Sequence, residues 1–392
     1  MKALILYGLT IIMGVAGLQA QSGFSQVLGE IESNNTSLEA MRQQAEAGKI
    51  SSRTGVFLQN PEVGFNYLWG APGEIGNRTD FSVIQSFDFP SAYKYKSNIA
   101  DLEVGQADLE YKARKIELMY EAHLICIDLV FHQKLLSENM VRLEYAQNIA
   151  DAVEKMFEQG KAGILEHNKA RLNLANSTND QSILEARINE LKAELVRYNG
   201  GRDVNLELTE YPAIVIPVDF DEWYAQAEEN NPILQYMSRQ VEISENTEKL
   251  SRAMSLPKFS AGYMSEKVVG EKYQGLSVGM SVPLWENKNT VKAARAQTAA
   301  NMALVNDSRL QLYNMLKNHY NKSMNFQKAA EGYSSSLLSV NNAELVKRAY
   351  DMGEISLIEY LVEVQFYYET LVKAMETRRE MYRAFAELKK WN

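Results

Sequence analysis

The sequence predicts a mainly α-helical protein with a small β part, arranged as two tandem structural repeats. Three observations support this fold class. Two long stretches lack proline and carry apolar residues at helical spacing. Each is preceded by two short segments in which apolar and polar residues alternate, and the second half of the chain repeats motifs of the first.

The first proline-free stretch predicts one long helix over about 91–158. Its apolar residues recur at helical spacing, as at Val141, Tyr145, Ile149, Ala152 and Met156. At 1.5 Å per residue such a helix would span about 100 Å. Because an amphipathic helix is stable only when its apolar face is buried, it needs partners along its whole length. The second stretch predicts an equivalent long helix over about 284–351.

Four segments with a period of two predict two β-hairpins. They cover about 61–69, 80–89, 257–264 and 274–282. In the first segment, for example, Phe65 and Tyr67 flank Asn66. Each strand would therefore have one apolar face and one face of mostly small or polar residues.

The internal repeat fixes the division of the chain. Residues 230–234 (Asn-Asn-Pro-Ile-Leu) correspond to residues 34–38 (Asn-Asn-Thr-Ser-Leu), and residues 350–353 correspond to residues 157–160. Such self-similarity at a nearly constant spacing indicates duplicated structural units. The mature chain is accordingly divided into two repeats, 21–219 and 220–392.

Glycines separate each long helix from the helix that follows it. Gly160 and Gly353 stand where a left-handed helix cap is expected. The helices predicted over 164–198 and 220–256, laid end to end, match the first long helix in length. The sequence thus predicts a bundle of long antiparallel helices with both glycine turns at one end and both hairpins at the other.

The N-terminus predicts a secretory signal peptide over 1–20. Lys2 precedes an apolar run and small residues lead to Ala20, after which we expect cleavage. The alternative, a membrane anchor, is weaker because the run is short. The rest of the chain has no long uncharged apolar stretch, so we expect no transmembrane helix. No cysteine lies near the cleavage site.

Composition excludes several classes of function. The formal net charge of −9 gives no basic face for nucleic acid. The four histidines lack ligand spacing, and no phosphate loop or nucleophile motif occurs, so we expect neither a metal site, nor a cofactor, nor an enzyme. Cys126 is the only cysteine; it cannot form a disulfide within the chain and is expected to be a buried structural thiol.

Four strands cannot close a barrel by themselves, and open sheet edges are not stable in lipid. The smallest membrane barrels have eight strands. We therefore expect several chains to share one barrel, with the apolar strand faces outward and the polar faces inward. The lipid-facing residues would be Phe65, Tyr67, Phe87 and Val278, and the lumen-facing residues Asn66, Ser82 and Ser277. The alternative is a water-soluble sheet whose apolar face covers a core.

The two glycine turns carry a resemblance to a known family. Phe157-x-x-Gly160 leads to Ile164-x-Glu166 with Ala170-Arg171, and Tyr350-Asp351-x-Gly353 leads to Leu357-x-Glu359. With these motifs, essentially the whole mature chain resembles the TolC-type outer-membrane efflux proteins. The resemblance implies a homotrimer with a 12-stranded transmembrane β-barrel in the outer membrane and a long α-helical barrel in the periplasm.

The resemblance also implies roles for single residues. The turns at Gly160, Lys161, Gly353 and Glu354 would form the periplasmic mouth that docks an adaptor. Glu359 falls where the family places an acidic ring that narrows the pore, with Glu363 one helical turn deeper. Glu166 and Tyr350 fall where linkages hold the mouth shut. The chain departs from the family at Ile355, where an arginine is expected, and at Val362, where an aspartate is expected. Taken singly, each glutamate is an ordinary solvated helix residue.

The implied function is that of a passive outer-membrane exit duct in a Gram-negative bacterium. It would serve a tripartite efflux system or type I secretion, with a periplasmic membrane-fusion adaptor and an inner-membrane pump of the RND or ABC type. The cargo would be a heavy-metal cation or a drug. The alternative is a periplasmic coiled-coil adaptor or scaffold that does not span a membrane.

Overall fold

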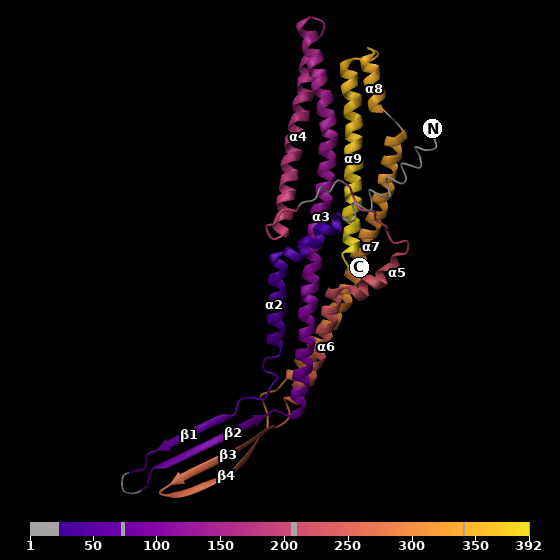
Figure 1. Cartoon of the computed structure of the whole chain (residues 1–392). Coiled ribbons are helices and arrows are strands. Elements are labelled where there is room, and N and C mark those ends of the chain that lie inside the picture. The colour runs from indigo at the N-terminus through magenta and orange to yellow at the C-terminus, as the bar shows by residue number, and fades with distance from the viewer. Residues whose placement is uncertain (1–22, 72–74, 205–209, 340–341, 392) are drawn as a thin grey trace. The chain divides into compact units, whose positions relative to one another are not determined.

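The computed structural model describes residues 23–71, 75–204, 210–339 and 342–391, so the expected signal peptide lies outside it. Residues 23–34 are helical. The elements that follow are α2 (Thr36–Ser52), β1 (Glu62–Leu68), β2 (Arg78–Phe87), α3 (Pro90–Glu158), α4 (Ile164–Tyr198), α5 (Phe220–Asn230), α6 (Pro232–Ala253), β3 (Lys258–Val268), β4 (Glu271–Ser281), α7 (Thr290–Ser339), α8 (Asn342–Asp351) and α9 (Leu357–Lys389). Figure 1 shows them in chain order.

The first long helix is confirmed. α3 runs unbroken over 69 residues, from Pro90 to Glu158. Pro90 stands in the first turn of the helix, where the missing N–H costs no hydrogen bond. No further proline follows within the helix, which is why the chain can continue at helical spacing over about 100 Å.

The second long helix is shorter than the expected 284–351. α7 begins at Thr290, after turns in which Asn289 has a positive φ of 69°. A left-handed residue cannot continue a right-handed helix, and asparagine tolerates this conformation better than most residues. The side chain of Asn287 donates to the carbonyl of Met254 at 2.6 Å and fixes this entry to the helix. α8 then covers Asn342–Asp351.

The strands form one antiparallel sheet in the order β1-β2-β3-β4. The second hairpin differs from the expected strands over 257–264 and 274–282. β3 and β4 are joined by only two residues, Val269 and Gly270, both with positive φ. Two left-handed central residues match the twist of a tight hairpin turn. The charged residues on either side, which lie outside the predicted strand bounds, continue the two strands.

The sheet register divides the strands into two faces. The apolar face carries Val63, Phe65, Tyr67, Phe81, Val83, Phe87, Phe259, Tyr263, Leu276, Val278 and Met280. The opposite face carries mostly small or polar residues, including Gly64, Asn66, Ser82, Ser86, Ser260, Gly262, Ser277 and Gly279. β1 and β4 are the two edges of the sheet in this chain.

The chain packs as two compact units. Within the described residues, the first comprises residues 23–39, 115–227 and 313–391, and the second comprises residues 40–114 and 228–312. Each unit therefore draws on both halves of the sequence, so the packing units differ from the tandem segments 21–219 and 220–392. None of the helices in the described residues is both long and apolar enough to cross a membrane.

The core of the first unit is aliphatic. Its most deeply buried side chains include Ile127, Leu129, Val130, Leu191, Leu316 and Leu388. Cys126 lies among them with no exposed surface and is unpaired, as expected. Burial raises the pKa of the Cys126 thiol to about 12, so the group stays a neutral, inert thiol.

Candidate functional site

The two glycine turns have the same hydrogen bonds. Gly160 has φ +70° and Gly353 has φ +74°. In the first turn the N–H of Lys161 donates to Met156 O at 2.8 Å; in the second the N–H of Glu354 donates to Ala349 O, also at 2.8 Å. These long closing bonds satisfy carbonyls at the helix C-terminus, as in a Schellman cap. The left-handed caps expected from the sequence are therefore present at both positions.

A glutamate caps the helix after each turn. Glu166 accepts a hydrogen bond from the backbone N–H of Gly163 at 3.0 Å. Glu359 accepts from the N–H and the hydroxyl of Ser356, both at 2.8 Å. The hydroxyl of Ser356 in turn accepts from the N–H of Glu359, which completes a reciprocal capping box.

These bonds set the protonation of Glu359. The backbone N–H of Ser356, followed by its hydroxyl, holds the pKa of the Glu359 carboxyl below its usual value. Hydrogen bonds to the charged form of a carboxylate favour that form. Glu359 is therefore ionised at neutral pH.

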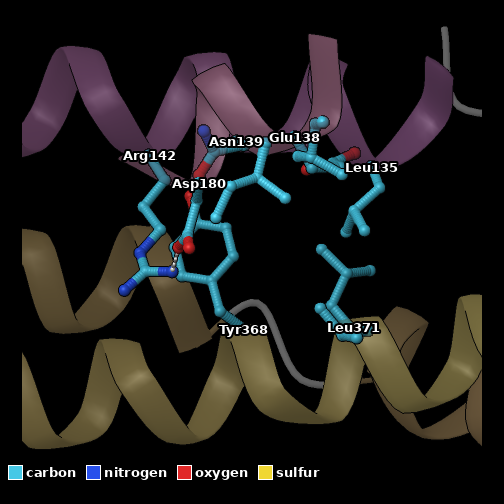
Figure 2. Close-up of a pocket in the computed structure, with 10 residues that line it drawn as sticks. Leu135, Glu138, Asn139, Arg142, Asp180, Tyr368 and Leu371 are labelled. Atoms are coloured by element: carbon cyan, nitrogen blue, oxygen red, sulfur yellow. Dashed lines mark hydrogen bonds and ion pairs between the residues drawn. The ribbon is translucent and has the colours of Figure 1, made fainter. Parts of the chain in front are cut away.

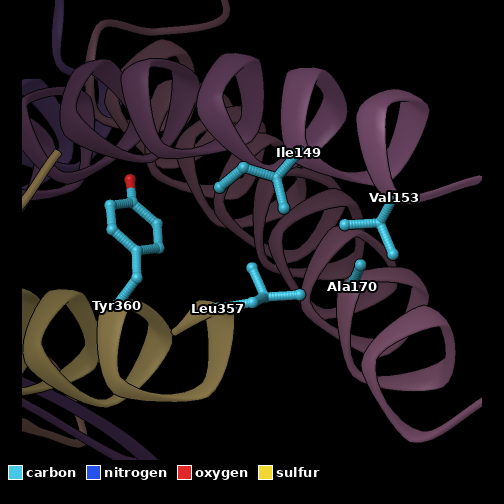
Figure 3. Packing of buried hydrophobic residues seen from close by; sticks show 5 residues of the cluster. All are labelled: Ile149, Val153, Ala170, Leu357 and Tyr360. Carbon is cyan, nitrogen blue, oxygen red and sulfur yellow. The ribbon is translucent and has the colours of Figure 1, made fainter. Parts of the chain in front are cut away.

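A small apolar cluster joins the two turns. Ile149 and Val153 of α3, Ala170 of α4, and Leu357 and Tyr360 of α9 bury their side chains together. Figure 3 shows Leu357 pointing between the helices toward Ala170 and Val153. We call these five residues the turn cluster. It holds the start of α9 against the α3–α4 hairpin.

Tyr350, expected to link the mouth, packs on the turn cluster. Its ring lies 5.0 Å from that of Tyr360, measured between centroids. Burial, and then the charges of Glu166 and Asp351, raise the pKa of the Tyr350 phenol. Tyr350 and Glu166 are thus neighbours within one chain. The linkages that the resemblance assigns to them stay a prediction.

Glu363 follows Glu359 by one helical turn on α9, and both side chains are exposed. The pairing of Glu359 with a lysine or arginine, considered as the ordinary alternative, does not occur within the described residues; its partner is Ser356. An acidic ring would need further copies of the chain, so this role also stays a prediction.

Sequence reasoning missed a histidine beside the first turn. His167 is 8 % exposed, its Nε2 lies 2.5 Å from a carboxylate oxygen of Glu154, and its ring stacks on Phe157 at 4.6 Å. Its Nδ1 is buried and has no partner within the described residues. Glu154 and His167 lie on opposite sides of the turn, and nothing in their sequence spacing indicates the pair.

Two cavities lie beside α3 and α9 in the first unit. An apolar pocket of about 200 Å³ between α3, α4 and α9 contains the ion pair of Arg142 and Asp180 at 3.5 Å, with Tyr368 under the guanidinium (Figure 2). A polar cavity of about 430 Å³ between α3, α7 and α9 contains Asp128, which binds Arg383 at 2.7 Å. Within the described residues no cluster of His, Cys, Asp or Glu could hold a metal ion.

The apolar face of the sheet is largely exposed in this chain. Val278 is 84 % exposed and Phe65 is 66 % exposed, and Tyr67 is also exposed. Phe87 lies on the same face but is half-buried. Asn66, Ser82 and Ser277 lie on the opposite face, so the expected separation of the two sets of residues is present in the register. Such a large exposed apolar surface indicates a lipid or protein contact.

No protein-family model matches the sequence, and neither does any curated protein. Solved structures match in fold. The outer-membrane channel OprN aligns over 94 % of this chain and 89 % of its own, with 14 % identity and a TM-score of 0.79. The CmeC outer membrane channel of Campylobacter jejuni aligns over 94 % and 85 %, with 16 % identity and a TM-score of 0.76. CusC, described for its transmembrane channel formation, aligns over 94 % and 91 %, with 13 % identity and a TM-score of 0.77. The TolC-like fold expected from the sequence is therefore confirmed.

Proposed function

We propose that this protein is a passive outer-membrane exit duct, built as a homotrimer. One observation carries the proposal: a four-stranded sheet with two open edges and an exposed apolar face, on a fold shared with outer-membrane channels. An open edge and an apolar face are both unfavourable in water for an isolated chain. Both are resolved when copies of the chain close a barrel in lipid.

The number of strands supports a trimer. Membrane barrels are closed because every backbone group must be hydrogen-bonded inside the bilayer. Three copies of a four-stranded sheet give about 12 strands, within the range of outer-membrane barrels. β1 of one copy would pair with β4 of the next. The small and polar residues around Asn66 and Ser277 would then line a water-filled lumen.

The glycine turns are the proposed docking surface for a periplasmic membrane-fusion adaptor. Gly160, Lys161, Gly353 and Glu354 are exposed, and the turn cluster holds both turns in one compact unit. A duct of this kind has no energy source of its own, so we propose an inner-membrane pump of the RND or ABC type as the third component. A heavy-metal cation or a drug is the proposed cargo, and type I secretion is the related alternative use.

The competing function is a periplasmic coiled-coil adaptor or scaffold. It accounts for the long helices but leaves the exposed apolar face of the sheet unexplained. We therefore favour the duct.

The experiment is to express the full chain, separate inner and outer membranes, and run the unboiled protein on a gel. We expect a heat-sensitive trimer in the outer-membrane fraction. The purified trimer should then give stable conductance steps in a planar bilayer. A monomer in the soluble periplasmic fraction, with no conductance, would support the adaptor or scaffold instead.

A further inference from the structure

Two lysines stand alone on the apolar face of the sheet. Lys267 of β3 and Lys272 of β4 are directly opposite each other in the register. They are the only charged residues that the strand register places on this face. Both are exposed, and neither forms an ion pair within the described residues. Like charges directly opposite on neighbouring strands are destabilising, so an anion beside them would relieve the repulsion.

The opposite face at the same end of the sheet is different. There Arg78 lies 2.8 Å from Asp80 and 3.2 Å from Glu266, so its charge is balanced. The two faces thus differ in kind: one carries neighbouring charges of both signs, and the other carries two positive charges without a carboxylate. This asymmetry points to a negatively charged partner on the apolar face.

The position of the lysines indicates where that partner lies. They flank the tight turn of the second hairpin, at one end of a face that becomes apolar toward Phe259 and Met280. Along β3, Lys267 is about 26 Å from Phe259 at 3.3 Å per residue, which is about 20 Å in height for a strand tilted by about 40°. The apolar band of a membrane barrel is about 25 Å tall, and lysines at its edge extend their ammonium groups toward the headgroups.

Aromatic residues mark the same level of the sheet. In the sheet register Tyr67 is opposite Thr79, and Thr79 is opposite Lys267. Its ring contacts that of Trp69 at 5.6 Å, and both rings are exposed. Tyrosine and tryptophan are enriched where a membrane meets water. The lysine pair therefore lies at an interface level and not within the hydrocarbon.

We propose that Lys267 and Lys272 form a binding site for the phosphate groups of lipid headgroups in the outer leaflet of the membrane. This inference rests on the proposed function, because the proposed duct has the hairpin tips on the outer side of the bilayer. The site would hold phosphorylated lipid around the barrel and would set the depth of the hairpins.

The test uses the full-length trimer in detergent, with a diphosphorylated glucosamine-disaccharide lipid as the probe and the same lipid without phosphates for comparison. Bound lipid is counted by native mass spectrometry for the parent and for a Lys267→Gln/Lys272→Gln variant. A Lys267→Arg/Lys272→Arg variant keeps the charge. An Arg78→Gln/Lys258→Gln variant removes the same number of charges from the other face.

We expect the parent, the arginine variant and the Arg78→Gln/Lys258→Gln variant to prefer the phosphorylated lipid. The affinity of the Lys267→Gln/Lys272→Gln variant should fall by about 30-fold at low salt, since each lysine near a charged headgroup contributes a factor of about five. Equal binding by that variant, an equal loss in the Arg78→Gln/Lys258→Gln variant, or displacement by millimolar inorganic phosphate would overturn the site.

Failure of this inference is distinguishable from failure of the proposed function. Each preparation is also added to a planar bilayer. If the parent inserts and conducts but shows no preference for phosphorylated lipid, only the lysine site is wrong. If the parent neither inserts nor conducts, the duct itself is wrong, and the site is rejected with it.

Discussion

At the residue scale, Glu359 has a structural reason to be acidic. Its carboxylate accepts two hydrogen bonds from Ser356 and so begins α9. Glu166 does the same for α4 with the N–H of Gly163. A capping role is enough to account for either residue in a single chain. The proposed role of Glu359 in the pore therefore needs a variant that separates charge from capping.

Glutamine makes that separation, because it can still accept the hydrogen bonds of a capping box while it carries no charge. We predict that the parent trimer is cation-selective in a planar bilayer and that Glu359→Gln weakens this selectivity while the capping box of α9 stays formed. Rings of carboxylates favour cations in pores. The control is Glu166→Gln, which makes the same change at the equivalent cap.

The measurement is the reversal potential under a salt gradient. The selectivity of the parent should decline near 1 M salt, where the Debye length is about 3 Å. If Glu359→Gln and the parent share the same reversal potential, Glu359 is a capping residue alone and the constriction lies elsewhere.

His123 is a second residue with a specific expected behaviour. It is buried beside Phe24, whose ring centroid is 5.5 Å away. Burial, with a smaller effect from Lys389, lowers the pKa of His123 to about 4. The unfolded chain, with a histidine pKa of about 6.5, binds a proton more readily than the folded chain. Stability should therefore decrease as the pH falls below about 6.5 and level off below about 4.

We predict that His123 alone lowers the free energy of unfolding by about 2 kcal/mol between pH 7 and pH 5. Thermal unfolding followed by helical circular dichroism measures this change. A His123→Gln variant should lose this part of the pH dependence. His132, whose Nδ1 lies 2.7 Å from Asp128 O, offers a control position for the same substitution. Unchanged pH dependence in His123→Gln would contradict the assignment.

At the element scale, the glycine turns are defined by backbone conformation. A Cβ added at Gly160 would meet no atom within 4 Å, so only its φ of +70° opposes a larger residue. We predict that Gly160→Val strains the turn by about 1–2 kcal/mol and weakens adaptor binding, while the trimer still inserts in the membrane. Gly163→Val is the matched control, because Gly163 has φ −83° and equally open surroundings.

Binding of a purified adaptor to the reconstituted trimer measures the effect. The duct account expects weaker binding for Gly160→Val than for Gly163→Val. Equal adaptor affinity in both variants would place the docking surface away from this turn.

The second prediction at the element scale concerns which face of the sheet contacts lipid. Val278 and Ser277 are neighbours in β4 but lie on opposite faces. Val278→Arg should disfavour membrane insertion by about 2–4 kcal/mol if it lies near the bilayer midplane, whereas Ser277→Arg should insert normally. Heat-sensitive trimer in the outer-membrane fraction measures assembly of both variants. Normal assembly of Val278→Arg together with failure of Ser277→Arg would reverse the two faces.

At the scale of the whole molecule, the features that could be predicted from the sequence are those that depend on the order of neighbouring residues. The absence of proline after Pro90 predicted the unbroken α3, and alternation predicted which residues of β1 share a face with those of β4. The strands predicted for the second hairpin were too short, since their bounds left Glu266, Lys267, Glu271 and Lys272 outside them, although charged residues are tolerated in an exposed strand. The pair of His167 and Glu154 depends on how two helices meet after a turn, which no spacing encodes.

The central claim is that copies of this chain share one closed sheet in the outer membrane. The direct measurement is disulfide cross-linking between the edge strands in intact membranes. Val63→Cys on β1 is combined in turn with Leu276→Cys, Val278→Cys and Met280→Cys on β4, and Cys126 stays silent because it is fully buried. The duct account predicts that at least one pair gives covalent dimers and trimers, and no larger species. Monomers alone for every pair, or a ladder that continues beyond three copies, would contradict the shared barrel.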